Sequence, residues 1–184
     1  ESLKYAMDVD ISTVEKEEHI SWIDILAVAG CRTGGKCGLQ SVKNAVKDLK
    51  NDKSPEELLG ELYKFYPYYY ESYKAVLGGL LGSYQIEVNG QKKASYGLKA
   101  FSPIAAGYGY SHCADFGNQR SFGFKRKHLG NDLMGQLGTP IVAVEGGTVE
   151  AMGWNRYGGW RIGIRSFDNK RYYYYAHLQK DRPF

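Results

Sequence analysis

The spacing of apolar side chains changes near residue 83, and this change constrains the fold more than any other feature of the sequence. Before it, apolar residues recur at intervals of three and four, as they do within residues 42–49. Such spacing places them on one face of a helix. Ser54, Pro55 and Glu57 then supply a cap hydroxyl, a first-turn proline and a reciprocal glutamate, which are typical of a helix start. The sequence therefore predicts a helical module over residues 1–83.

Further helix boundaries can be placed inside this module. Ser21 is expected to cap a helix that ends before Gly30. Pro67 is expected to end or kink the helix that begins at Ser54, because its ring does not fit the interior of a helix. Another helix then reaches Gly82. The aromatic residues of 65–70 fall in this part, and we interpret them as packing side chains rather than as a stacking platform for sugars or bases.

From Tyr84 onward, apolar residues alternate with a period of two, and Asn89-Gly90 is a favoured hairpin turn. Later segments of strand composition are separated by turns that contain Gly, Asp or Asn: 141–144, 148–152, 160–164 and 171–175. Short strands with such turns indicate a compact antiparallel sheet. We therefore expect an α+β protein, with the helical module at 1–83 followed by a β-rich domain at 84–184.

Composition excludes few classes of protein. Apolar residues make up 43% of the 184 residues and charged residues 24%, which is ordinary globular usage. No apolar stretch is long enough to cross a bilayer, and no basic-then-apolar leader is visible at the N-terminus, so a signal or membrane anchor is expected only as a removed N-terminal segment. The net charge of +4 favours contact with a polyanion, which the anionic polymers of a cell wall would satisfy as well as a nucleic acid.

Three cysteines do not define a disulfide framework. Cys31 and Cys37 flank a Gly-containing loop and could be bridged in an oxidising compartment, whereas Cys113 is distant. The odd number argues against a framework of bridges, and free thiols remain an equal alternative.

His128 and Asp132 are the most informative side chains for function. An imidazole and a carboxylate four positions apart can close on one metal ion, although this pair alone is a weak signal. A Gly-rich β pattern over residues 138–149 follows, and a further histidine stands in Tyr175-Ala176-His177-Leu178. This ordered set resembles the LytM and lysostaphin-like zinc metallopeptidases, also called peptidase family M23, from about Phe101 to the end of the chain.

The resemblance implies roles for these residues. His128 and Asp132 match the two zinc ligands of the family's His-x-Gly-x-Asp segment, and His177 matches a histidine of the active site that does not bind the metal. The family's later His-x-His, which contributes the third protein ligand, has no counterpart, because none of the four histidines lies two residues from another. A catalytic zinc site normally has three protein ligands, so we expect a segment beyond residue 184 to complete it.

The function implied by the resemblance is an extracytoplasmic, zinc-dependent endopeptidase that hydrolyses peptide bonds in bacterial cell-wall peptidoglycan. The alternative is a catalytically inactive scaffold of the same fold at the cell envelope. A biotinyl carrier is rejected, because the segment 149–152 is followed by Gly153 where that motif requires lysine. Nucleic-acid binding is not expected either, since the basic residues Arg120 and 125–127 belong to no recognised reader motif.

Two other histidines were weighed for a role. His112, Cys113 and Asp115 lie close enough in sequence to resemble metal ligands, but we interpret His112 as a structural residue, given how often short motifs mislead. His19 has no motif around it, and we predict no function for it.

Overall fold

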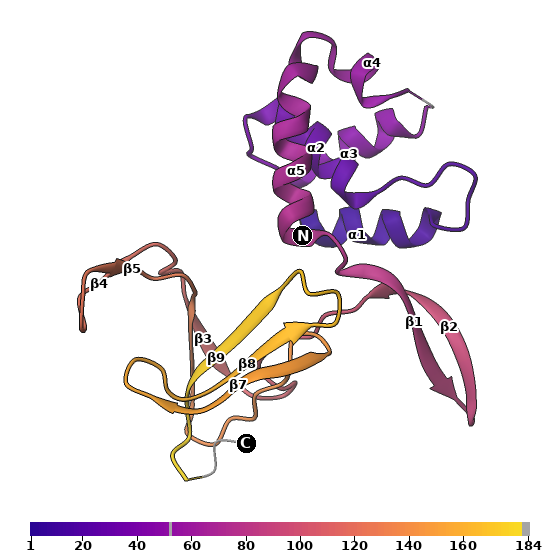
Figure 1. Ribbon diagram of the computed structural model, residues 1–184. Coiled ribbons are helices and arrows are strands. Elements are labelled where there is room, and N and C mark those ends of the chain that lie inside the picture. Colours follow the sequence, from indigo (N-terminus) through magenta and orange to yellow (C-terminus); the bar gives the residue numbers. More distant parts are fainter. Residues whose placement is uncertain (52, 182–184) are drawn as a thin grey trace. The chain divides into compact units, whose positions relative to one another are not determined.

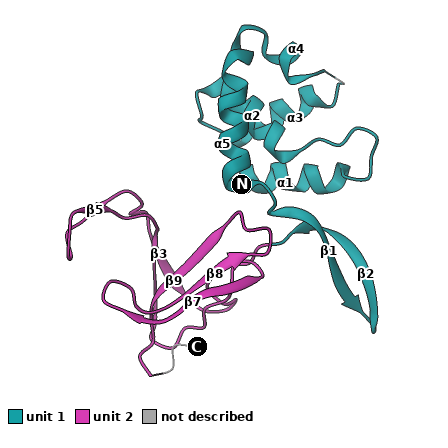
Figure 2. Ribbon diagram, viewed as in Figure 1, with its two compact units in different colours: residues 1–99 teal, residues 100–184 magenta. Residues whose placement is uncertain are grey.

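The computed structural model describes residues 1–51 and 53–181 (Figure 1). The chain forms two compact units, residues 1–99 and 100–184, which are described separately (Figure 2). Unit 1 contains the helices and a hairpin of β1 (Leu81–Val88) and β2 (Gln91–Leu98), whereas unit 2 contains the remaining strands. The chain is thus α+β. The boundary expected between residues 83 and 84 falls inside β1, and the units divide between Lys99 and Ala100 instead.

The helices of unit 1 pack around α2 (Trp22–Thr33). Ile25, Leu26 and Val28 of α2 are essentially inaccessible to solvent. The other helical elements are α1 (Ser2–Thr13), α3 (Leu39–Leu49), α4 (Pro55–Leu59), the 3₁₀ helix η1 (Gly60–Phe65) and α5 (Tyr66–Leu77). None of the described helices is both long and apolar enough to cross a membrane.

The expected helix starts are confirmed, but some ends differ. Ser54 and Glu57 form the predicted capping box, and Ser21 caps α2 by accepting a hydrogen bond from a backbone N–H. α2 continues past Gly30 to Thr33, because a single glycine weakens a helix without ending it. Pro67 lies in the first turn of α5, where its missing N–H has no consequence, so it begins a helix instead of ending one.

The buried carboxylate of Asp10 joins the β1–β2 hairpin to the helices. Asp10 is 2% exposed and accepts hydrogen bonds from the Trp22 backbone N–H (2.8 Å) and the Tyr96 hydroxyl (3.0 Å). His19 Nε2 lies 2.9 Å from the same carboxylate. Burial of Tyr96 and its hydrogen bond to Asp10 raise the pKa of Tyr96 to about 12, so the hydroxyl remains a donor. These contacts explain why the hairpin belongs to unit 1.

The three cysteines are free thiols. Cys31 is buried, and burial raises the pKa of its thiol. Cys37 Sγ lies 3.0 Å from the Tyr73 hydroxyl. Of the two alternatives for Cys31 and Cys37, a disulfide or two free thiols, the structure shows free thiols.

Unit 2 is built around an antiparallel sheet of β7 (Gly147–Asn155), β8 (Gly159–Ser166) and β9 (Tyr172–Leu178), in that order. These strands confirm the segments predicted at 148–152, 160–164 and 171–175. Gly147 is required at the start of β7, because a Cβ there would lie 2.1 Å from the Arg165 carbonyl oxygen of the paired strand.

The segment 141–144 is not a strand, contrary to expectation. It makes one isolated bridge, between Ile141 and Ile104. Pro140 and Pro103 lie at the ends of this pairing, and proline removes a donor from any ladder that it would join. The Val144 N–H instead donates to the Tyr175 hydroxyl at 2.8 Å.

Glu145, directly after this segment, anchors β9. Its carboxylate accepts two hydrogen bonds of 2.7 Å from the Arg171 guanidinium and one of 2.5 Å from the Tyr173 hydroxyl. The side chains of Arg171 and Glu145 are only 12% and 10% exposed. The bonds from Arg171 lower the pKa of Glu145, with a smaller opposing effect of burial. The carboxylate therefore stays ionised inside the unit.

Candidate metal centre

Two short antiparallel strand pairs of unit 2 carry the candidate site. β3 (Tyr110–Cys113) pairs with β6 (Asp132–Gly135), so that Cys113 lies opposite Asp132. β4 (Gln119–Arg120) pairs with β5 (Arg126–Lys127). His128 directly follows β5 and Asp132 begins β6, which places the two predicted ligands on one connecting segment.

Backbone hydrogen bonds fix this connecting segment. The His128 N–H donates to the Asn118 carbonyl at 2.8 Å, and the Gly117 N–H donates to the His128 carbonyl at 2.7 Å. The Asn131 side chain accepts from the Phe116 N–H at 3.2 Å. The segment after β3 is thereby held against His128 and Asp132.

The structure brings a third side chain and second carboxylate, Asp115, to the predicted pair. The ligand atoms of Asp115, His128 and Asp132 all lie within 4.8 Å of one another. His128 Nδ1 is 3.1 Å from Asp115 Oδ2, and His128 Nε2 is 3.5 Å from Asp132 Oδ1. Among the described residues, this is the one group of three or more such side chains close enough to share a metal ion.

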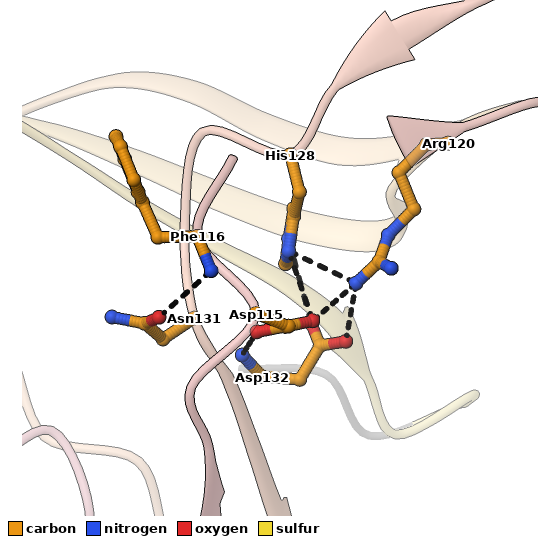
Figure 3. A network of polar contacts seen from close by, with 6 residues as sticks. All are labelled: Asp115, Phe116, Arg120, His128, Asn131 and Asp132. Atoms are coloured by element: carbon orange, nitrogen blue, oxygen red, sulfur yellow. Dashed lines mark hydrogen bonds and ion pairs between the residues drawn. The ribbon is translucent and has the colours of Figure 1, made fainter. Parts of the chain in front are cut away.

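The guanidinium of Arg120 contacts all three side chains of this group (Figure 3). Its Nη2 is 2.9 Å from His128 Nδ1 and 3.0 Å from Asp132 Oδ2, and it makes a shorter contact with Asp115 Oδ2. Two carboxylate oxygens and one imidazole nitrogen therefore contact one nitrogen. With its proton on Nδ1, His128 donates to Asp115 Oδ2; without it, Nδ1 competes with the two carboxylates for the two hydrogens of Nη2.

Asp115 is strongly held in its ionised form. The Asp132 backbone N–H donates to Asp115 Oδ1 at 3.0 Å, and this bond is the main cause that lowers the pKa of Asp115. Burial acts in the opposite direction, and Arg120 lowers the pKa further. The side chain of Asp115 is 13% exposed, compared with 44% for Asp132. Asp115 is thus a persistent anion at the inner side of the group.

The donor set suits a divalent metal ion. Zinc takes imidazole nitrogen and carboxylate oxygen as ligands at about 2.0 to 2.2 Å, which separates ligand atoms of a tetrahedral site by about 3.4 Å. The 3.1 Å contact between His128 Nδ1 and Asp115 is close to that separation, whereas the 3.5 Å contact with Asp132 is made by the other ring nitrogen, Nε2, and one imidazole gives only one nitrogen to an ion. The cationic guanidinium already seated among the three side chains also shows that the position favours positive charge.

His177 is not a member of this group. It lies near the end of β9, is exposed, and has a φ of 57°. A positive φ is uncommon for a residue other than glycine. It coincides with a register irregularity between β8 and β9, and the His177 N–H donates to the Gly158 carbonyl at 2.7 Å instead of following the ladder. The structure thus gives His177 a specific backbone conformation.

Sequence reasoning did not select Asp115 or Arg120 for this site. His112 and Cys113, considered beside Asp115 as ligands, are exposed on β3 and lie outside the group. Asp115 is 13 residues from His128, and the pairing of β3 with β6, together with the backbone bonds between residues 117–118 and His128, brings them together. The hydrogen bonds around Asn118 and Asn131 that complete this arrangement leave no recognisable spacing in the sequence.

Comparison with known proteins is consistent with the geometry. The family model described as Peptidase family M23 matches residues 126–182, which include His128, Asp132 and His177 but neither Asp115 nor Arg120. A protein from Bacillus subtilis (strain 168), the L-Ala–D-Glu endopeptidase, is 45% identical over 76 residues. No solved structure gives a significant match.

The family-model match lies within unit 2, and the alignment with the relative covers only part of each chain. The aligned region covers 41% of this chain and 23% of the Bacillus subtilis protein, so the chain spans about a quarter of that relative's length. The match nevertheless contains the ordered His-x-Gly-x-Asp and Tyr-x-His-Leu segments in the same stretch. Residues 126–182 of this chain are therefore similar to peptidase family M23.

Proposed function

We propose that unit 2 is part of a zinc-dependent endopeptidase that hydrolyses peptide bonds of bacterial cell-wall peptidoglycan. The observation that carries the proposal is the convergence of His128, Asp132 and Asp115 on one position, within a chain that contains a segment of a peptidase family. Such a substrate lies outside the cytoplasm, so we also propose an extracytoplasmic location.

His128 and Asp132 would hold the zinc ion, and Asp115 supplies a further oxygen donor next to them. When bound, zinc would lower the pKa of a coordinated water and polarise the scissile carbonyl. The residues of the chain keep the donors in place. The Asp132 N–H fixes one oxygen of Asp115 and leaves the other directed at His128.

His177 is proposed as the residue that handles a proton without binding the metal. An imidazole titrates near neutral pH, so it can orient or deprotonate a water or donate to a developing oxyanion. The exposed position of His177 on β9 leaves its ring accessible to a substrate. The family role, rather than a measured distance to the metal group, supports this assignment.

The name of the Bacillus subtilis relative indicates which bond to test first. We propose that the substrate is a peptide with a bond between L-alanine and D-glutamate, and that the carboxylates of such a peptide suit a chain of net charge +4. A peptide with glycyl-glycine bonds is the matched alternative, because it offers the same reaction without the acidic residue.

The test is hydrolysis of both peptides by the full-length natural protein, followed by mass spectrometry. We expect cleavage at L-Ala–D-Glu, no cleavage by His128→Ala, and slow cleavage with zinc retained by His177→Ala. Unchanged turnover of His128→Ala would refute the zinc mechanism. Loss of zinc from His177→Ala would show that this histidine is a ligand. A zinc-loaded protein that cleaves neither peptide nor intact peptidoglycan would instead support the inactive scaffold.

A further inference from the structure

Arg120 occupies the position at which the three assigned metal donors converge. We propose that Arg120 is the resident cation of the metal-free site, and that zinc binds by displacing its guanidinium. The inference rests on the proposed function, because it concerns how the same site takes up its metal.

The geometry places the guanidinium and a metal ion in competition. Nη2 of Arg120 contacts Asp115 Oδ2, His128 Nδ1 and Asp132 Oδ2, and a zinc ion would use the lone pairs of the same three side chains. Nη2 can give its two hydrogens to the two carboxylates, whereas a metal ion can accept a lone pair from both carboxylates and from the unprotonated imidazole nitrogen. The two cations cannot occupy the same volume, so binding of one requires departure of the other.

Charge explains why the metal-free site needs a substitute. Asp115 and Asp132 bring two carboxylates together, and the Arg120 guanidinium is within ion-pair distance of both. Without a cation the carboxylates would repel each other across a partly buried space. Arg120 therefore stabilises the metal-free fold, and the same stabilisation weakens the apparent affinity for zinc.

The side chain of Arg120 has a route out of the site. It is 33% exposed and belongs to β4, which is paired with β5 over only two residue pairs. A long side chain at a partly exposed position can move its guanidinium into solvent without rearrangement of the backbone. The protein can thus remain folded before metal arrives and take up zinc only above a concentration that Arg120 sets.

Arg126 provides a matched control. It lies directly opposite Arg120 in the β4–β5 register and carries the same charge. Its Nη1 donates to the Phe122 carbonyl at 2.7 Å, and its guanidinium lies over the Phe124 ring, 5.3 Å from the centroid. Arg126→Gln removes one positive charge from the same hairpin, so it measures the general effect of charge on zinc affinity.

The experiment measures the dissociation constant of Zn²⁺ by competition with a chromophoric chelator for wild type, Arg120→Gln and Arg126→Gln. If the state with Arg120 withdrawn is populated at about one part in ten or less, removal of the side chain tightens zinc binding about tenfold or more. Arg126→Gln is expected to change it by less than about twofold, since the Arg126 guanidinium contacts the Phe122 carbonyl and the Phe124 ring instead of the metal donors.

Thermal unfolding gives a readout that is independent of affinity and activity. In the presence of a chelator, Arg120→Gln is expected to melt below wild type, and saturating zinc should remove the difference. An Arg120→Gln variant that folds only with zinc would also support the exchange of the Arg120 guanidinium for zinc. A variant that stays unfolded at saturating zinc would overturn it, because Arg120 would then be a purely structural residue.

The outcomes separate the inference from the proposed function. Equal zinc affinity of wild type and Arg120→Gln, or weaker binding by the variant, would overturn the exchange and leave the zinc site intact. Absence of zinc binding by wild type and by both variants would instead refute the zinc site itself, and with it the exchange.

Discussion

The buried ion pair of Glu145 with Arg171 is expected to dominate the stability of unit 2. In Glu145→Gln the Arg171 guanidinium loses its ionised partner while it remains only 12% exposed. Removal of one partner from a buried pair costs about 3 to 5 kcal/mol. Asp168 still contacts Arg171 at 3.0 Å and compensates in part, so we expect the lower end, about 3 kcal/mol.

Native-state hydrogen exchange of the β8 amides measures this change within unit 2, without interference from unit 1. Glu150→Gln is the matched control, because Glu150 makes a similar two-bond pair with Arg165, at 3.0 and 3.2 Å, but the side chains are 43% and 33% exposed. An exposed pair contributes about 1 kcal/mol or less. Equal losses of protection in the two variants would refute the argument from burial.

Three further predictions concern pH, unit 1 and the metal site. The pKa of Glu145 is lowered and that of Asp168 is lowered to about 2, chiefly by the Arg171 guanidinium and the Ser166 hydroxyl respectively. Both carboxylates therefore stabilise unit 2 fully above their ordinary pKa values of 4.5 and 3.8, and this stabilisation is lost as pH falls towards 2. Protection of the β8 amides against hydrogen exchange should be lower at pH 3 than at pH 7. If Glu145→Gln shows the same decrease in protection between the two pH values as wild type, the role of Glu145 is contradicted. In unit 1, Asp10→Ala leaves the Trp22 N–H and the Tyr96 hydroxyl without their acceptor. It should lower the free energy of unfolding of unit 1 by about 2 to 4 kcal/mol, as measured by hydrogen exchange of the α2 amides. Asp10→Asn, which keeps an acceptor, should cost less, and an equal cost would contradict the hydrogen-bond explanation. At the metal site, Asp115→Asn should weaken zinc binding about 10- to 100-fold, whether Asp115 binds the metal or orients its ligands. Zinc affinity equal to wild type in a calorimetric titration would exclude both roles.

Local patterns in the sequence predicted the elements that local chemistry determines. The Ser54 capping box, the Asn89-Gly90 turn and the strands β7 to β9 all depend on residues close together in the chain. The α1 helix was not predicted. Nor was the attachment of the β1–β2 hairpin to unit 1, which depends on Asp10, whose partners lie up to 86 residues away.

The same distinction holds for the candidate site. His128 and Asp132 were found because four residues separate them. Asp115 and Arg120 could not be found in that way, because the pairing of β3 with β6 and of β4 with β5 brings them to the site. A guanidinium among candidate metal donors is a property of the folded chain, and no spacing in the sequence indicates it.

The central claim is that His128 and Asp132 jointly bind one zinc ion in unit 2. Isothermal titration of the full-length natural protein with zinc, in parallel with His128→Ala, tests it most directly. We predict one zinc ion per chain for wild type. For His128→Ala we predict a zinc affinity lower by about 100-fold or more, because loss of a residue that only supports a ligand already lowers metal affinity about 10- to 100-fold. Equal stoichiometry and affinity in the two proteins would contradict the claim.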